Sequence, residues 1–501
     1  MPYRSRYQYL QQLGYTSIYQ VGKTVCTVDQ VHELRIHIDS AEYFECLANL
    51  LERAEHSIYI LGWDIDSRTA LKKSPEGGTQ KDFHLYFLLQ NLIKSKPHLN
   101  IYLLCWNYSI LFSLERELWP VFKPQAWGER IHFVLDKYHP LLSSHHQKVV
   151  VVDDTYACVG GIDICENRYD HPEHRLDDPR RLNALGKSYQ PWHDIHCVFS
   201  GPLAKKIGLL CRTRWTFATG KDISPPPIEC SEDTPLPLPF PGQLRDQYVG
   251  VCRTQPRYKK QRRARENFSA TVELIRKSKK FIYIENQYLT SRSIRKALER
   301  SLEAPQGPEI IVVLPKFPFG WRENVTIAVL QTRVLRKLKE KDLHKRFKAY
   351  FPQLSSRESS YLYVHSKLIL VDDLFAKIGS TNINNRSMGL DTEMDLLWEV
   401  QDQPSHEALI DFRCRLIAEH TGSNFDDVRS RHDRPLIQLI EELSIGERRL
   451  EAHKPTTSDW LDYLIPHIPF FDSPQPIHWS YLVLYFWYRL KTTLRRARRR
   501  P

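Results

Sequence analysis

Apolar residues along this chain follow two different periods, which predict helices and buried strands in a repeated order. After Ser40, a suitable helix N-cap, apolar side chains recur at helical spacing as far as Ala54, and the apolar run Ile58–Leu61 then predicts a strand. The same order returns in the second half, where residues 268–275 carry an apolar helical face and Phe281–Ile284 follows as a strand. Each half of the chain is therefore expected to begin with a helix and a buried strand.

Further strands are predicted at Ile101–Leu104 and Ile310–Leu314, and two four-residue apolar runs, Val149–Val152 and Leu368–Val371, predict strands buried on both faces. Helices and strands alternate in the same way in both halves, which favours a mixed α/β fold. We expect two pseudo-symmetric α/β lobes, each with its own central mixed sheet.

A proline-rich segment separates the two halves, since residues 224–242 contain little that could form regular structure. The pattern changes again after about residue 424, where short helical and proline-punctuated segments follow. The predicted organisation is a first lobe at 1–222, a linker at 223–245, a second lobe at 246–424 and a helical extension at 425–501.

Composition limits the partners and the compartment. The 501 residues are 42% hydrophobic and carry a formal net charge of +12, which favours anionic partners such as acidic lipid, nucleic acid or a phosphorylated substrate. The ten cysteines are scattered without a C-x-x-C pair, so neither a structural zinc site nor a disulfide framework is expected. The sequence shows neither a signal peptide nor an apolar run long enough to span a bilayer. We expect a cytoplasmic protein, with export by a leaderless route left open.

One motif occurs twice with identical internal spacing. A histidine and a lysine two residues apart are followed by four apolar residues, an aspartate and a small-residue pair. The copies are His146, Lys148, Asp153 and Gly160-Gly161, and His365, Lys367, Asp372 and Gly379-Ser380.

This motif carries the chemistry of phosphodiester cleavage. Histidine can attack phosphorus or donate a proton near neutral pH, and lysine can stabilise the phosphoryl oxygens. In an extended segment, residues two apart point to the same side, so each histidine and lysine can act as a unit. Two such units can supply a nucleophile and an acid on opposite sides of one phosphorus atom.

The repeated motif is similar to the H-x-K-x4-D-x6-G-[GS] signature of the phospholipase D superfamily. Other segments resemble its eukaryotic-type members: residues 162–170, 191–196, 283–288 and 381–393. The resemblance covers roughly residues 35–425 and implies two similar α/β lobes with the active site between them.

The resemblance also implies residue roles. His146, Lys148, His365, Lys367 and Asn382 would surround the phosphate, with His146 as the nucleophile and His365 as the general acid, although pseudo-symmetry makes this assignment reversible.

Carboxylates are expected to orient the two histidines, and we assign Asp194 to His146 and Glu393 to His365. Asp153 and Asp372 are expected to stabilise the lobes, although a catalytic role stays open. Asp163 stands where the second copy has Asn382, and it is expected to point away from the phosphate, toward backbone amides.

The implied reaction is hydrolysis of phosphatidylcholine-like lipids to phosphatidic acid, with transfer of the phosphatidyl group to other alcohols. It needs neither a metal nor a cofactor. A basic aromatic stretch at 479–500 is expected to contact a phospholipid surface. We expect a monomer and no nucleic-acid partner. Alternatives are a cardiolipin-synthase-like phosphatidyltransferase, a nuclease and a non-catalytic lipid-binding module.

Overall fold

The computed structural model describes residues 8–74, 76, 83–107, 127–227, 237–318, 321–454 and 472–475. The predicted basic aromatic stretch at 479–500 lies outside these residues, as does part of the proline-rich linker. The domain boundaries predicted from the sequence stay a prediction.

The first half of the chain supplies strands and helices in the order that the sequence predicts. Its elements are α1 (Gln8–Gln12), β1 (Thr27–Ile38), α2 (Ser40–Arg53), β2 (Ser57–Gly62), α3 (Leu85–Ser95), β3 (Asn100–Trp106), β4 (Ile131–Asp136), β5 (Val149–Val152), β6 (Tyr156–Gly160), β7 (Trp192–His193), β8 (Ile195–Ser200) and α5 (Pro202–Thr219).

The second half repeats much of this order and adds helices after it. Its elements are β9 (Leu244–Gln255), β10 (Ala264–Arg265), α6 (Glu266–Lys277), β11 (Phe281–Glu285), α7 (Arg292–Glu303), β12 (Glu309–Val313), α8 (Trp321–Lys341), β13 (Phe347–Gln353), β14 (Tyr363–Val364), β15 (Leu368–Val371), β16 (Phe375–Gly379), β17 (Glu393–Glu399), α9 (Gln403–Thr421), α10 (Phe425–Ser430), α11 (Leu436–Leu443) and β18 (Arg449–Ala452).

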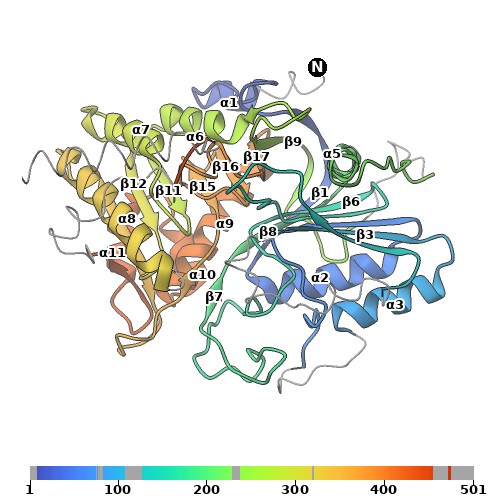
Figure 1. The fold of residues 1–501 in the computed structure, drawn as a ribbon. Coiled ribbons are helices and arrows are strands. Elements are labelled where there is room, and N and C mark those ends of the chain that lie inside the picture. The colour runs from blue at the N-terminus through green and yellow to red at the C-terminus, as the bar shows by residue number, and fades with distance from the viewer. Residues whose placement is uncertain are drawn as a thin grey trace, which may run out of the picture.

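The mixed α/β fold class is confirmed, and the two halves share one sheet (Figure 1). Sixteen of the described strands form it, in the order β18-β13-β12-β11-β15-β16-β17-β9-β1-β8-β6-β5-β2-β3-β4 with β10 beside β9. The expected separate sheets are joined because β1 and β9 pair antiparallel, from Thr27 with Val251 to Leu34 with Leu244. On either side of this junction the strand order is the same, which makes the two halves pseudo-symmetric.

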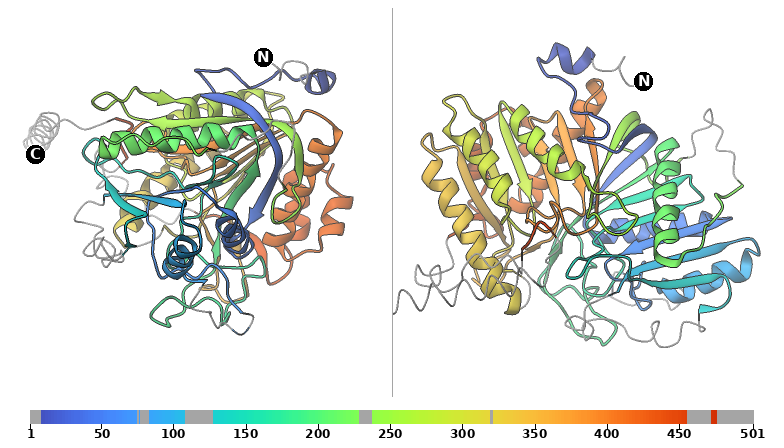
Figure 2. Two further views of the ribbon diagram at one scale, coloured as in Figure 1. Left: turned by 90° about the vertical axis from the view of Figure 1, so that its right-hand side faces the viewer. Right: turned by 45° about the horizontal axis from the view of Figure 1, so that its top comes forward.

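Helices cover both faces of the sheet in the first half, which explains why its central strands are buried throughout and mostly apolar. Ile58 and Ile60 of β2 pack in one cluster with residues of α2 and α3. The alternate residues Tyr59 and Leu61 pack in a second cluster that includes Trp215 of α5. Two further views show α5 on the opposite side of the sheet from α2 and α3 (Figure 2).

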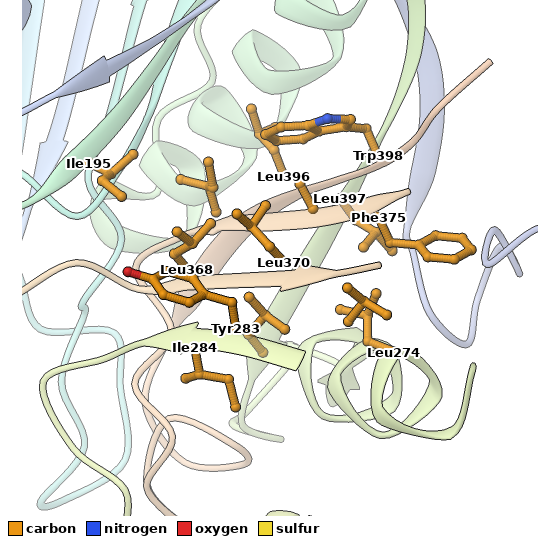
Figure 3. Close-up of a cluster of buried hydrophobic side chains, with 14 of the residues drawn as sticks. Ile195, Leu274, Tyr283, Ile284, Leu368, Leu370, Phe375, Leu396, Leu397 and Trp398 are labelled. Carbon is orange, nitrogen blue, oxygen red and sulfur yellow. The ribbon is translucent and has the colours of Figure 1, made fainter. Parts of the chain in front are cut away.

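The second half is built on the same plan. Leu368 and Leu370 of β15 lie in a cluster with Tyr283 of β11 and Leu274 of α6 (Figure 3). β5 and β15 have the bounds that the apolar runs predict, and both are fully buried. The helix predicted to follow Ser40 is present and includes Ser40 as its first residue.

Its N-cap, however, is Asp39 and not Ser40. The Asp39 side chain makes no capping hydrogen bond. Its carboxylate is instead within ion-pair distance of the imidazoles of His174 and His193.

The motif aspartates hold the helix-to-strand turns of each lobe. The Asp153 carboxylate accepts hydrogen bonds from the backbone N–H groups of Glu55, His56 and Ser57. Asp372 does the same at the start of β11, with the N–H groups of residues 279–281. These contacts support the structural role that the sequence suggests for both residues.

No helix within the described ranges is long and apolar enough to cross a membrane.

Candidate active site

The segment leading to His365 runs beside a strand of the first lobe. β14 (Tyr363–Val364) and β7 (Trp192–His193) form a separate two-stranded parallel sheet. The pairing continues past the strands, since the His365 N–H donates to the His193 carbonyl at 2.8 Å. The next residue in each segment, His365 on one and Asp194 on the other, therefore lies at the junction of the two lobes.

The segment leading to His146 has the equivalent arrangement in the other lobe. An isolated parallel bridge joins His145 to Thr392 of the second lobe, and the His146 N–H donates to the Thr392 carbonyl at 2.8 Å. Glu393 follows Thr392 and opens β17. Each motif histidine is thus carried into the neighbourhood of a carboxylate from the opposite lobe.

The carboxylates are exchanged between the two histidines relative to our sequence assignment. Nδ1 of His146 lies 3.0 Å from Oε2 of Glu393, and Nδ1 of His365 lies 2.6 Å from Oδ2 of Asp194. The pairing of Asp194 with His146 and of Glu393 with His365 is therefore wrong. We assigned each carboxylate to the histidine of its own lobe from their separation along the chain. The parallel bridges between the lobes instead place each carboxylate beside the histidine of the other lobe.

The glycine pair of the first motif copy, Gly160 and Gly161, lies where the backbone packs directly against neighbouring side chains. A Cβ atom on Gly161 would lie 2.0 Å from Oδ1 of Asp194, and one on Gly160 would meet the His196 ring. In the second copy, Gly379 faces Asp395 in the same way. Any side chain at Gly161 would displace the carboxylate that holds the histidine of the other lobe.

Both motif lysines are buried beside the histidines. Lys148 and Lys367 are each 2% exposed, so their charges are poorly screened by water. Nζ of Lys148 lies 2.8 Å from Oδ2 of Asp163, and Nζ of Lys367 donates to the His365 carbonyl. The other Asp163 oxygen accepts the Trp63 N–H at 2.9 Å, so Asp163 does contact a backbone amide as expected. Its ion pair with Lys148, however, places it beside the motif groups and not away from them.

The four motif groups act on one another electrostatically. Burial, reinforced by the charges of Lys148 and Lys367, lowers the pKa of His146 to about 3. Burial, then Lys367 and to a smaller extent Arg168 and Lys148, lowers the pKa of His365 well below its usual value. Each histidine therefore responds to the lysines of both lobes, as a single shared site requires.

Comparison with protein families supports the same conclusion from the sequence side. Residues 128–231 match the family described as phospholipase D, and residues 271–412 match the family described as cardiolipin synthase, PLD-like domain. The two matched segments contain the two motif copies. The chain belongs to the phospholipase D superfamily.

Related proteins with about one quarter of their residues identical to this chain include plant and amoebal phospholipases D. The chain is 26% identical to phospholipase D alpha 3 of Arabidopsis thaliana, a match that covers 72% of this chain and 60% of the relative. It is 24% identical to phospholipase D A of Dictyostelium discoideum, over 78% of this chain and 35% of that protein. The chain thus spans less than two thirds of the length of either relative.

A solved structure with the same fold is phosphatidylserine synthase of Haemophilus influenzae. It superposes with a TM-score of 0.54 at 13% identity, over 82% of this chain and 93% of the synthase. The phospholipase D fold therefore extends over most of the described chain.

Some residues that contact the motif histidines were not predicted to do so from the sequence. The centroid of the Trp192 ring lies 4.2 Å from the Arg168 guanidinium and 4.9 Å from the centroid of the His365 ring. Ser380, expected to be structural, also contacts the site, because its carbonyl lies 3.0 Å from Nδ1 of His146. Neither aromatic stacking nor a backbone carbonyl contact leaves a recognisable sequence spacing.

The proposed phosphate ligand Asn382 is buried at the same place. Nδ2 donates to Oε1 of Gln287 at 3.4 Å, a long hydrogen bond. Oδ1 has no hydrogen-bond partner within the part of the chain that the structure describes. The amide is therefore poorly satisfied by the protein itself, which suits a group that contacts a ligand.

A cluster of buried histidines and carboxylates lies behind His365. Within the described residues, Asp39, His174, His193 and Glu419 bring ligand atoms within 4.8 Å of one another, close enough to hold a metal ion. Nδ1 of His174 also lies 2.9 Å from Asp170. The imidazoles therefore bridge carboxylates on both sides, which already provides ionic partners for the buried groups.

Proposed function

We propose that this protein is a phospholipase D-type enzyme. It would cleave the distal phosphodiester of phosphatidylcholine-like lipids, releasing phosphatidic acid and the head-group alcohol, and would transfer the phosphatidyl group to added alcohols. The observation that carries the proposal is the pair of exchanged histidine–carboxylate contacts within the field of both lysines.

His146 is suited to be the nucleophile. Its Nδ1 faces the Ser380 carbonyl, which can only accept a hydrogen bond, so Nδ1 carries the proton and Nε2 keeps its lone pair. The lowered pKa of His146 keeps the imidazole neutral at physiological pH. Nε2 attacks phosphorus and forms the P–N bond as the bond from phosphorus to the head-group oxygen breaks.

His365 completes the cycle as acid and then base. Its Nε2–H gives a proton to the departing alcohol oxygen, and in the second step Nε2 takes a proton from the water that attacks phosphorus and breaks the P–N bond. The bound phosphodiester brings a negative charge that opposes Lys367 and Lys148 and raises the pKa of His365. Substrate binding therefore favours the protonated acid. Both lysines and Asn382 stabilise the phosphoryl oxygens.

Product analysis tests the proposal directly. Vesicles of labelled phosphatidylcholine are incubated with the protein and ethanol, and phosphatidic acid and phosphatidylethanol are separated. His146→Ala and His365→Ala should each abolish both products. If the wild-type protein forms neither product, or if one of these variants keeps full turnover, the shared-site mechanism is wrong.

A phosphatidyltransferase that uses a lipid alcohol as acceptor is the second candidate. It is favoured by the match of residues 271–412 to the family described as cardiolipin synthase. Supplying phosphatidylglycerol as both donor and acceptor distinguishes the two, since a synthase would form cardiolipin and glycerol faster than phosphatidic acid.

An exposed basic hairpin supports a membrane-bound lipid as the substrate. Residues 257–265, which form the turn after β9 together with β10, contain six arginines and lysines, most of them exposed. Thr254 pairs with Glu393, so the hairpin leaves the sheet at the end that carries the active site. The Lys260 N–H donates to the Tyr138 hydroxyl at 3.1 Å, which fixes the hairpin on the loop before His145. Such a charge cluster attracts anionic lipid head groups.

A further inference from the structure

One buried carboxylate contacts both segments that carry the His365–Asp194 pair. Glu285 ends β11 and is 0% exposed. Its Oε2 accepts a hydrogen bond from the Ser366 hydroxyl at 2.7 Å and lies 2.8 Å from Nε2 of His193. Ser366 follows His365 in the chain, and His193 precedes Asp194. The Oε2 atom of Glu285 thus contacts the residue next to His365 and also the residue next to Asp194.

The second oxygen of Glu285 is held just as firmly. Oε1 accepts a hydrogen bond from the Tyr283 hydroxyl at 2.6 Å and lies 2.8 Å from Nε2 of His420 on α9. Burial alone would raise the pKa of Glu285, but the charge of His193 and the close contacts of its carboxylate with His193 and His420 hold that pKa well below its usual value. Glu285 is therefore a fixed negative charge with four close donors, and its position cannot relax easily.

The opposite side of His193 is held by the cluster described above. Nδ1 of His193 lies 2.8 Å from Oε1 of Glu419 and 3.0 Å from Oδ1 of Asp39. The Asp39 N–H also donates to the Asp194 carbonyl at 2.8 Å. Contacts from α9, from the start of α2 and from β11 therefore converge on the segment that carries Asp194.

The first lobe has no carboxylate at the corresponding place. In the sheet register Glu285 pairs with Leu368, and Leu61 pairs with Val149, which precedes Leu368 by the same 219 residues that separate the two motifs. Leu61 is thus the counterpart of Glu285. The His146–Glu393 pair is supported from a different position, because Oδ2 of Asp136 lies 3.1 Å from Nε2 of His145, and Nδ1 of His145 lies 3.1 Å from the Thr392 hydroxyl.

We propose that Glu285 is a positioning residue that acts through Ser366 and His193 to keep the His365–Asp194 pair in the geometry for protonating the leaving alcohol. This inference rests on the proposed function. A general acid contributes about 10²- to 10⁴-fold to the rate, and only when the leaving group needs a proton. The loss of rate caused by substituting Glu285 should therefore depend on the leaving group of the substrate.

The test compares two leaving groups in Glu285→Gln, a substitution that keeps the size of the side chain and removes its charge. With phosphatidylcholine, whose alcohol needs a proton, kcat should fall about 100-fold or more, with a much smaller change in KM. With phosphatidyl-p-nitrophenol, whose anion leaves unaided, the first-turnover burst of p-nitrophenol should stay within about tenfold of wild type. Later turnovers should be slow, because His365 must also activate water.

Glu399→Gln is the matched control. Glu399 is also a buried carboxylate, 1% exposed, but its Oε2 accepts the Ile18 N–H at the far end of β17. This variant should keep both rates. If Glu285→Gln does not fold, Ser366→Ala removes one of the two links and should show the same pattern at about a tenth of the effect.

Three results are decisive. An equal loss on both substrates means that Glu285 serves the fold or the nucleophile, and overturns the proposal. Unchanged rates on both substrates also overturn it. If wild-type protein cleaves neither substrate, the proposed function fails instead.

Discussion

Asp372→Asn separates a structural from a catalytic role of the motif aspartates. Oδ1 of Asp372 accepts the N–H groups of Lys280 and Phe281 at 2.9 and 2.8 Å, and Oδ2 accepts the Lys279 N–H and the Tyr15 hydroxyl at 2.7 Å each. Asparagine has the same shape and tolerates the φ of 56° at this position, so the backbone is not strained. Only the charge and one acceptor are lost.

The expected loss of stability follows from these contacts. A hydrogen bond to a charged group contributes about 1 kcal/mol more than a neutral one, and a donor left without a partner costs about 1–3 kcal/mol. Three weakened short bonds and one lost bond at Asp372 therefore amount to about 4 kcal/mol, and the longer contact from the Ser278 hydroxyl, at 3.3 Å, adds little. For a chain of 501 residues the unfolding entropy is about 1 kcal/mol per degree, so the melting temperature should fall by about 4 °C.

Differential scanning calorimetry and initial rates at 20 °C, below the transition, provide the assay. Asp372→Asn and Asp153→Asn should both melt earlier and keep kcat within about threefold, because neither carboxylate contacts the site. Asp433→Asn, an exposed control, should change neither quantity. If Asp372→Asn abolished turnover without lowering the melting temperature, the aspartate would act in the chemistry and this reasoning would be refuted.

Three further predictions follow from charges in the fold. Burial lowers the pKa of Lys367 from 10.5 to about 7, so its charge is present below that pH and lost above it. KM for phosphodiester should therefore rise as pH increases through about 7, and a KM that is flat from pH 6 to 8 would contradict this. Arg413→Met leaves the buried Asp373 carboxylate without the two 2.8 Å contacts and should cost about 3–5 kcal/mol, seen as earlier melting that Arg413→Met combined with Asp373→Asn partly restores. Each hairpin cation near an anionic surface contributes about 1 kcal/mol, so neutralising four of them should weaken the affinity for anionic vesicles, measured by sedimentation, roughly a thousandfold. Binding to neutral vesicles should not change. The variant replaces Lys259, Lys260, Arg262 and Arg263 with glutamine, and its control replaces Lys205, Lys206, Lys337 and Lys339. Equal binding by variant and control would exclude the hairpin as the contact.

The sequence by itself determined the local elements and the identity of the chemical groups. The strands at Val149–Val152 and Leu368–Val371 follow from apolar runs that only a sheet covered on both faces can bury. The repeated motif gave the family, and the family comparison confirms it. These features depend on residues close together in the chain, so composition and spacing reveal them.

Only the tertiary structure decided which lobe supplies each carboxylate. From the sequence, Asp194 and Glu393 were correctly expected to orient the motif histidines, but each was assigned to the wrong histidine. The parallel bridges that bring Asp194 to His365 and Glu393 to His146 join residues far apart in the chain. The continuous sheet through β1 and β9 and the convergence of buried charges on His193 were missed for the same reason. Strand pairing and ion pairing between distant segments depend on how complete lobes pack, and no local pattern in the sequence records that packing.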